Sequence, residues 1–400
     1  MVESVRRLMF LMGVYYFLQG MSGNAGLHDQ ALDRFLIQTL GLGAAQMNAF
    51  SFLVTIPWMI KPLYGILADS VPIVGYRIKS YFFTGSILAS VAYLGIYRWG
   101  YSASSLGKLL VVSAVGIALA DVLCDKLMVI KGQPLDATDR LQAAQWFAIS
   151  LAGILTTFIG GYIAEYVPLQ RAVFFSLPFA LMVIPVTVFL WEEKRVESVN
   201  VAAKEAWSGL KSALRLKPLW GCAIFLFLYH MSPGLGKTLR LYEINVLKFS
   251  QIQIGHIDTL GSIGSMIGVF FFGVWCKKFS ERWLLRGIVV SGSAATLLYV
   301  FFRDPLSAFL ITFGAGMVGA VAFLGILTLA ARVCPKNAEG MVFALLMSVI
   351  NFSTKLGGML GGLLFDTVGF QWLVVISTTT TLVMWFFLPL VRERQLNRNA

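Results

Sequence analysis

The chain has 400 residues, of which 58% are hydrophobic and only 13% are charged. Soluble domains contain about 45–50% apolar and about 25% charged residues, so this composition excludes an ordinary water-soluble fold. The formal net charge of +12 does not predict a nucleic-acid partner, because the basic residues lie between apolar runs and do not gather on one predicted surface.

Apolar runs long enough to cross a bilayer recur along the whole chain. We predict an all-α integral membrane protein with twelve transmembrane helices at residues 8–27, 45–66, 80–98, 106–130, 141–164, 171–191, 219–240, 251–275, 283–302, 306–330, 338–363 and 370–391. The longest polar stretch separates six spans from six. We therefore expect an N-terminal six-helix bundle (1–191), a cytoplasmic linker (192–217) and a C-terminal six-helix bundle (218–400).

Between the second and third spans lies a segment that a generic span does not need. Residues 61–79 contain Lys61, Pro62, Gly65, Asp69, Gly75, Arg77 and Lys79. After a small insertion, this spacing resembles the Gly-x-x-x-Asp-x-x-Gly-Arg-Lys signature of the major facilitator superfamily. Six plus six spans with a charged central loop is also the plan of that superfamily, whose halves are structural repeats.

Four blocks, at residues 15–20, 57–65, 69–77 and 120–125, resemble the folate–biopterin transporter family within that superfamily. The resemblance is strongest over residues 8–130 and thins beyond Lys217. It implies a secondary carrier that moves a folate or a pterin by alternating access, with protons as the coupling partner. The alternatives are a carrier or exporter of another organic anion or nutrient, and a non-transporting membrane sensor or scaffold.

The signature loop predicts a cytoplasmic gate. Gly65 allows two helices to approach closely, as small residues do in membranes. Asp69 lies across a tight turn from Arg77 and Lys79, and Asp125 of the fourth span lies within reach of Arg77. We expect these five residues to hold the cytoplasmic side shut. The alternative is that they determine only topology and folding.

Ionisable residues inside spans are costly and therefore mark candidate functional sites. Asp121 and Asp125 are four residues apart, on one face of a helix. Two carboxylates this close repel each other when both are charged, which suits a proton-coupled carrier. His230 is a third proton candidate because imidazole titrates near neutral pH. The alternatives are that Lys61 or Lys126 neutralises Asp121 and that His230 only packs.

The resemblance also suggests what a binding cavity must contain. Folates carry glutamate carboxylates and a flat pterin ring, so the cavity needs cations together with aromatic or amide partners. The candidates are Lys61 and Gln19 in the first half, and Lys237, Arg240, Lys355 and Asn351 in the second. Lys61 could instead extend its charge to the membrane interface. For the amides, hydrogen bonding between helices is the alternative.

The seventh span is interrupted by Pro233, Gly234 and Gly236, and we expect it to bend toward the transport pathway. Residues 234–238 look like part of a phosphate-binding loop, but that motif requires a glycine where Met231 stands, and a preceding strand. We therefore expect no nucleotide here.

The sequence offers no catalytic or metal-binding set. Its three histidines and four cysteines lack metal-ligand spacing and form no defensible catalytic triad, so we expect neither an enzyme nor a cofactor. Lys and Arg predominate in the loops on the side of Arg6 and Arg7, which predicts that both termini are cytoplasmic. We expect a monomeric, multi-pass protein in the lipid bilayer of the cell membrane.

Overall fold

The computed structural model describes residues 2–135, 137–190, 214–215, 217–275, 281–333 and 339–391. In these ranges the chain is helical, and one isolated bridge between Ile73 and Tyr76 is the only extended pairing. The chain divides into unit 1, Met1–Leu40 with Leu53–Ala206, and unit 2, Gly41–Phe52 with Trp207–Ala400. Nearly all of the predicted linker lies outside the described residues.

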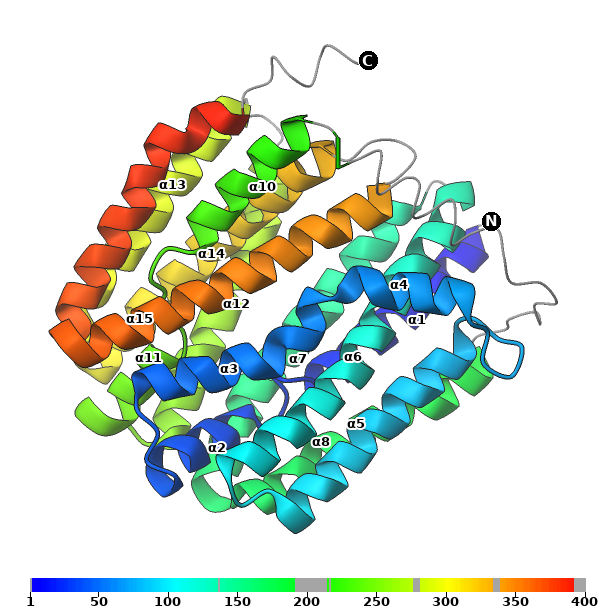
Figure 1. Ribbon diagram of the computed structural model, residues 1–400, viewed down its shortest axis with the longest axis horizontal. Coiled ribbons are helices and arrows are strands. Elements are labelled where there is room, and N and C mark those ends of the chain that lie inside the picture. Colours follow the sequence, from blue (N-terminus) through cyan, green and yellow to red (C-terminus); the bar gives the residue numbers. More distant parts are fainter. Residues whose placement is uncertain are drawn as a thin grey trace. The chain divides into compact units, whose positions relative to one another are not determined.

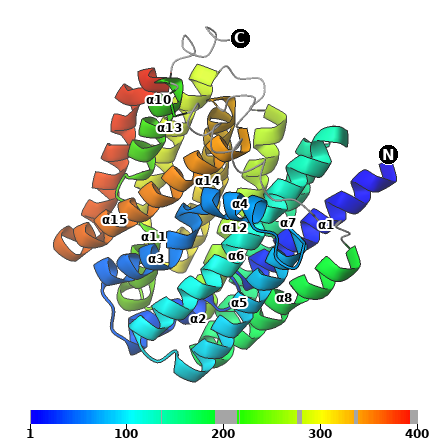
Figure 2. The ribbon, with the colours of Figure 1, turned by 45° about the vertical axis from the view of Figure 1, so that its right-hand side comes forward.

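The first half of the chain forms the following elements: α1 (Val2–Ser22), α2 (Asp29–Arg34), the π-helix η1 (Phe35–Thr39), α3 (Ala44–Met59), α4 (Lys61–Ser70), α5 (Lys79–Trp99), α6 (Ala103–Gly132), η2 (Gln133–Leu135), α7 (Thr138–Tyr166) and α8 (Leu169–Leu190). In unit 1, α5 lies beside α6 and α8, as both views show (Figures 1 and 2).

The second half forms α10 (Lys217–His230), α11 (Gly236–Leu241), the π-helix η3 (Tyr242–Val246), α12 (Gln251–Trp275), α13 (Glu281–Leu297), η5 (Leu298–Phe301), α14 (Pro305–Val333), α15 (Glu339–Val383) and η6 (Met384–Val391). In unit 2, α12 packs along α14, and α13 packs against both α14 and α15 (Figure 1).

Within the described ranges, nine helices are long and apolar enough to cross a membrane. The last, Val342–Leu390, covers the final two predicted spans. Gly369 separates these two spans within α15, with φ 80° and ψ 177°, a conformation open almost only to glycine. Predicted span 1 corresponds to α1, and predicted span 7 runs over α10 and most of α11. The prediction of an all-α, multi-pass protein is confirmed.

The two halves begin in the same way. In each, a long helix breaks, a short helix follows, and a single π-helix leads to a residue with positive φ before the next span. That residue is Gly41 (φ 65°) in the first half and Lys248 (φ 56°) in the second. This shared succession supports the internal repeat, and it provides a register for comparing equivalent positions.

Each unit has its own apolar core. In unit 1 the core gathers buried residues such as Leu11, Phe82 and Leu123 from α1, α5 and α6. In unit 2 it gathers residues such as Phe225, Ile326 and Leu346 from α10, α14 and α15. These cores fix the helices that carry the charged side chains described next.

Candidate functional site

A buried ion pair joins α4 to α6 in unit 1. Helix α3 ends at Met59 and α4 begins at Lys61, because Pro62 has no N–H with which to continue the first helix. The Lys61 ammonium donates to Asp121 Oδ2, and the two side chains are only 16% and 5% exposed. The alternative in which Lys61 neutralises Asp121 is therefore the arrangement that the structure contains.

Further partners hold both members of this pair. Gln19 of α1 donates from Nε2 to Asp121 Oδ1 at 2.9 Å, so each carboxylate oxygen accepts a hydrogen bond. The Lys61 nitrogen also lies 4.8 Å from the centroid of the Trp58 ring, within the range of a cation–π interaction. A buried ion pair needs such additional contacts to offset its lost hydration.

Asp125 lies one turn beyond Asp121 on α6, as the spacing predicted. Its Oδ1 accepts a hydrogen bond of 2.7 Å from the hydroxyl of Tyr16. Tyr16 and Gln19 are three residues apart on α1, so one face of α1 supplies a donor to each carboxylate. We call Tyr16, Gln19, Lys61, Asp121 and Asp125 the charged cluster. Sequence analysis singled out four of them and missed the role of Tyr16.

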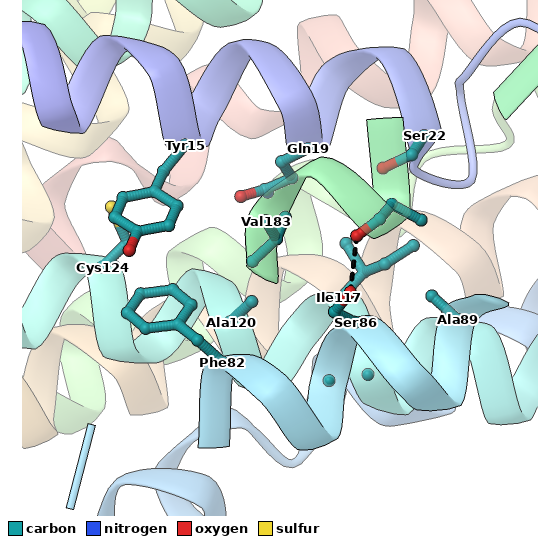
Figure 3. Close-up of a pocket in the computed structure, with 13 residues that line it drawn as sticks. Tyr15, Gln19, Ser22, Phe82, Ser86, Ala89, Ile117, Ala120, Cys124 and Val183 are labelled. Atoms are coloured by element: carbon teal, nitrogen blue, oxygen red, sulfur yellow. Dashed lines mark hydrogen bonds between the residues drawn. The ribbon is translucent and has the colours of Figure 1, made fainter. Parts of the chain in front are cut away.

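A small pocket of about 30 Å³ borders this cluster and is lined by Gln19. Figure 3 shows Tyr15 and Gln19 projecting into it from α1, with Phe82 of α5 and Ala120 of α6 nearby. The Tyr15 and Phe82 rings stack with centroids 4.4 Å apart, and Ser86 donates to the Ala180 carbonyl. The pocket is nearly filled by these side chains.

The predicted gate loop is a tight hairpin between α4 and α5. Ile73 and Tyr76 exchange two backbone hydrogen bonds of 3.0 Å, and the central residues Val74 and Gly75 have φ of 54° and 82°. Ser80 donates to the Ile73 carbonyl at 2.6 Å, and this bond ties the hairpin to α5.

Other parts of the predicted gate are less fully described. A Cβ built at Gly65 would lie 3.9 Å from the Val122 side chain, so α4 runs close to α6. The side chain of Asp69 lies outside what the structure describes, and Asp125 faces Tyr16. The closure by Asp69, Arg77, Lys79 and Asp125 stays a prediction.

Arg240, one of the predicted cations of the second half, has two carboxylate partners within unit 2. Arg240 Nη1 donates to Glu243 Oε2 at 3.0 Å, and Nη2 forms an ion pair with Asp258 of α12. Glu243 is only 2% exposed. Lys237 lies on α11 with Arg240. Sequence analysis did not predict the Glu243 partner, because the one-turn spacing of 240 and 243 spans the join between α11 and η3.

Lys355 and His230 lie toward other polar groups. Lys355 Nζ donates to Ser51 Oγ at 3.0 Å, and His230 Nδ1 lies 3.3 Å from Thr354 Oγ1. Asn351 is one turn before Lys355 on α15. The structure thus brings the first-half candidates into one cluster, while those of the second half are distributed over α10, α11 and α15.

The site residues supply no metal centre in the described part of the chain, where no three His, Cys, Asp or Glu side chains could hold an ion. The charged cluster itself contains two carboxylates and one lysine, groups that can exchange protons and bind anions. A carboxylate that gains a proton would release the Lys61 charge, and a lysine without its carboxylate would attract an anion.

Comparison with known proteins places this geometry in context. The model of the BT1 family matches residues 19–398. The folate-biopterin transporter of Synechocystis sp. (strain ATCC 27184 / PCC 6803 / Kazusa) is 28% identical, over 94% of this chain and 80% of its own. Folate transporter 1 of Plasmodium falciparum (isolate 3D7) is 24% identical, over 90% of this chain and 75% of its own.

Solved structures share the fold at low identity. The nucleoside transporter NupG matches with a TM-score of 0.74 and 13% identity, over 97% of this chain and 100% of that chain. A D-xylose-proton symporter matches with a TM-score of 0.73 and 13% identity, over 97% and 98%. The predicted major-facilitator-type fold is confirmed.

Proposed function

Because the chain belongs to the BT1 family, we propose that it is a secondary carrier that moves a folate or a pterin across the membrane together with protons. It is a multi-pass membrane transporter and not an enzyme. The names of its relatives support the substrate class, and the charged cluster supports the coupling.

The ion pair between Lys61 and Asp121 is the observation that carries the coupling. When Asp121 binds a proton, Lys61 loses its counter-charge in a site with little water. When the substrate is a folate, the free ammonium then binds one of its glutamate carboxylates. Because binding free energies are reciprocal, the bound anion in turn favours the protonated Asp121. Proton and substrate therefore bind together.

Gln19 and the second carboxylate shape this exchange. Gln19 donates to Asp121 through an amide, so it can hold that side chain in either protonation state. Asp125, held by Tyr16, is a second place for the proton one turn along α6. We assign Asp121 and Asp125 together as the proton site, with Lys61 and Gln19 in contact with the substrate.

The other predicted roles belong to the same proposal. Transport proceeds by alternating access in a monomer in the cell membrane, with both termini cytoplasmic. The second half contributes the substrate candidates Lys237, Arg240, Lys355 and Asn351 and the proton candidate His230, and the cytoplasmic gate consists of Gly65, Asp69, Arg77, Lys79 and Asp125.

The test is uptake of labelled folates and pterins by vesicles that contain the purified protein, with and without an inward proton gradient. Wild-type uptake should rise with the gradient, and Asp121→Asn should lose that response. Asp304→Asn is the matched control, because Asp304 is an exposed carboxylate before α14. Wild-type uptake that does not depend on the gradient would refute the proton coupling. If the wild type takes up neither folates nor pterins, the substrate assignment is refuted.

A further inference from the structure

Unit 2 contains a cavity that the charged cluster does not use. It has a volume of about 340 Å³ and lies between α10, α13, α14 and α15. Small-molecule sites occupy about 300–1,000 Å³, so this volume suits a compact ligand. We call it the second-half cavity.

The first half has a pocket in the equivalent place, between α1, α5, α6 and α8, but its volume is about 30 Å³ (Figure 3). The two pockets use the same face of α6 and of its equivalent α14. The α6 lining residues Gly116, Ile117, Ala120 and Cys124 stand at the same distances from the helix start as Val318, Gly319, Ala322 and Ile326 of α14. The halves therefore differ in how they fill one common position.

Two residue exchanges explain the difference in volume. Gly116 lets α6 touch α5, since a Cβ built on Gly85 would lie 2.4 Å from the Gly116 carbonyl oxygen. Val318 stands in place of Gly116 and prevents such a backbone contact. Beside it, Gly319 stands in place of Ile117, and a Cβ at Gly319 would meet nothing within 4 Å. The space that the Ile117 side chain fills in the first half is therefore open at Gly319 in the second half.

The walls of the second-half cavity combine aromatic rings with hydrogen-bonding groups. Tyr229, Tyr299 and Phe323 supply the rings. His230 Nε2 is buried and has no hydrogen-bond partner among the residues that the structure describes, while Nδ1 is engaged near Thr354. Buried polar atoms are almost always paired in native proteins, and Nε2 is therefore a hydrogen-bonding group that a bound ligand can engage.

We propose that the second-half cavity binds the flat pterin ring of the substrate, an inference that rests on the proposed function. A pterin presents two π faces for stacking on aromatic side chains and an edge of nitrogen and oxygen atoms that can pair with His230 Nε2. The glutamate tail of a folate does not fit this role, because neither lysine nor arginine is among the described residues that line the cavity.

The chain itself suggests the variant that tests this. Gly319→Ile introduces into α14 the residue that fills the equivalent pocket in α6, and the new side chain has room to enter the cavity. Gly287→Ile is the matched control, because Gly287 lies on the exposed face of α13 and a Cβ there also meets nothing within 4 Å. His230→Ala removes the polar partner without filling the volume.

Binding to the purified, detergent-solubilised protein is measured by equilibrium dialysis with two probes. One is free pterin, and the other is p-aminobenzoylglutamate, which carries the glutamate carboxylates but no pterin ring. Gly319→Ile should weaken pterin binding about tenfold or more, and His230→Ala about tenfold, which corresponds to the loss of one good interaction. Both variants should leave binding of p-aminobenzoylglutamate unchanged, and Gly287→Ile should bind both probes as the wild type does.

The outcomes separate this inference from the proposed function. If the wild type binds pterin and both Gly319→Ile and His230→Ala bind it equally well, the cavity is not the ring site, although folate transport stands. If a folded wild type binds neither pterin nor folate, the proposed function fails and the ring assignment fails with it. If Gly319→Ile elutes as an aggregate, pterin binding by His230→Ala decides whether the second-half cavity is the ring site.

Discussion

Removal of Lys61 alone should cost more stability than removal of both charges of the buried pair. Lys61→Met leaves the Asp121 carboxylate, which is 5% exposed, without its cation. Breaking a buried ion pair in this way costs about 3–5 kcal/mol. Since Gln19 still donates to Asp121 and the lysine side chain is itself 16% exposed, we expect the lower end, about 3 kcal/mol.

The double variant Lys61→Met with Asp121→Asn tests the origin of that loss. It removes both charges and keeps an oxygen that can accept from Gln19, so its free energy of unfolding should return to within about 1 kcal/mol of the wild type. Unfolding is measured by titration with SDS in mixed micelles, and a double-mutant cycle gives the coupling energy between the two side chains. Uptake driven by a proton gradient should be absent from Lys61→Met, from Asp121→Asn and from the double variant.

Stability and transport therefore separate in this experiment. A merely structural ion pair would recover both properties in the double variant, whereas a coupling pair recovers stability alone. If Lys61→Met unfolds with the free energy of the wild type, the pair is not a buried, unscreened interaction. If the double variant transports with full proton coupling, the assignment of Asp121 is wrong.

Three further predictions concern the scaffold and are read as thermal unfolding midpoints in detergent. Gly116→Val should destabilise by about 1–3 kcal/mol or more, because its Cβ would meet the Gly85 carbonyl oxygen at 2.3 Å, whereas Gly153→Val has open space; equal midpoints would contradict the close contact. Val74→Asn should stabilise by about 1 kcal/mol, since a β-branched residue at φ 54° is strained and asparagine is not; a lower midpoint would show that the valine is needed there. The backbone and side chain of Ser307 hold the pKa of Asp304 below its usual value, so its contribution to the start of α14 is present above the unfolded pKa of about 3.9 and is lost as pH falls through the lower folded value. Asp304→Ala should therefore lower the midpoint at pH 7 and have little effect at the lowest pH at which the protein stays folded.

The sequence predicted the spans well because a bilayer imposes a length and a composition that can be read directly. It also predicted that Lys61, Asp121 and Asp125 matter, because charges inside spans are rare and costly. It left open which partner each charge takes. The hydroxyl of Tyr16 on Asp125 depends on how α1 is rotated against α6, and helices that are apolar on nearly every side give no periodic signal for that rotation.

The partners in the second half illustrate the same limit. Arg240 and Glu243 lie on either side of the join between α11 and η3, and Asp258 reaches Arg240 from α12. Sequence analysis treated Arg240 as available for a substrate carboxylate. The structure gives it two carboxylates already, so a substrate would have to displace one of them. Lys61 forms its direct ion pair with Asp121 alone among the described residues, so it is a stronger candidate than Arg240 for binding a substrate carboxylate.

Equivalent positions of the two halves indicate how their roles diverged. Counted from the start of α3 and on through α4, Lys61 stands at the position of Gly268 in α12. Counted from the start of α6, Asp121 stands at the position of Phe323 in α14. The ion pair of the first half thus corresponds to a glycine and to an aromatic wall of the second-half cavity. One repeated scaffold therefore carries a charged pair in its first copy and an open aromatic cavity in its second.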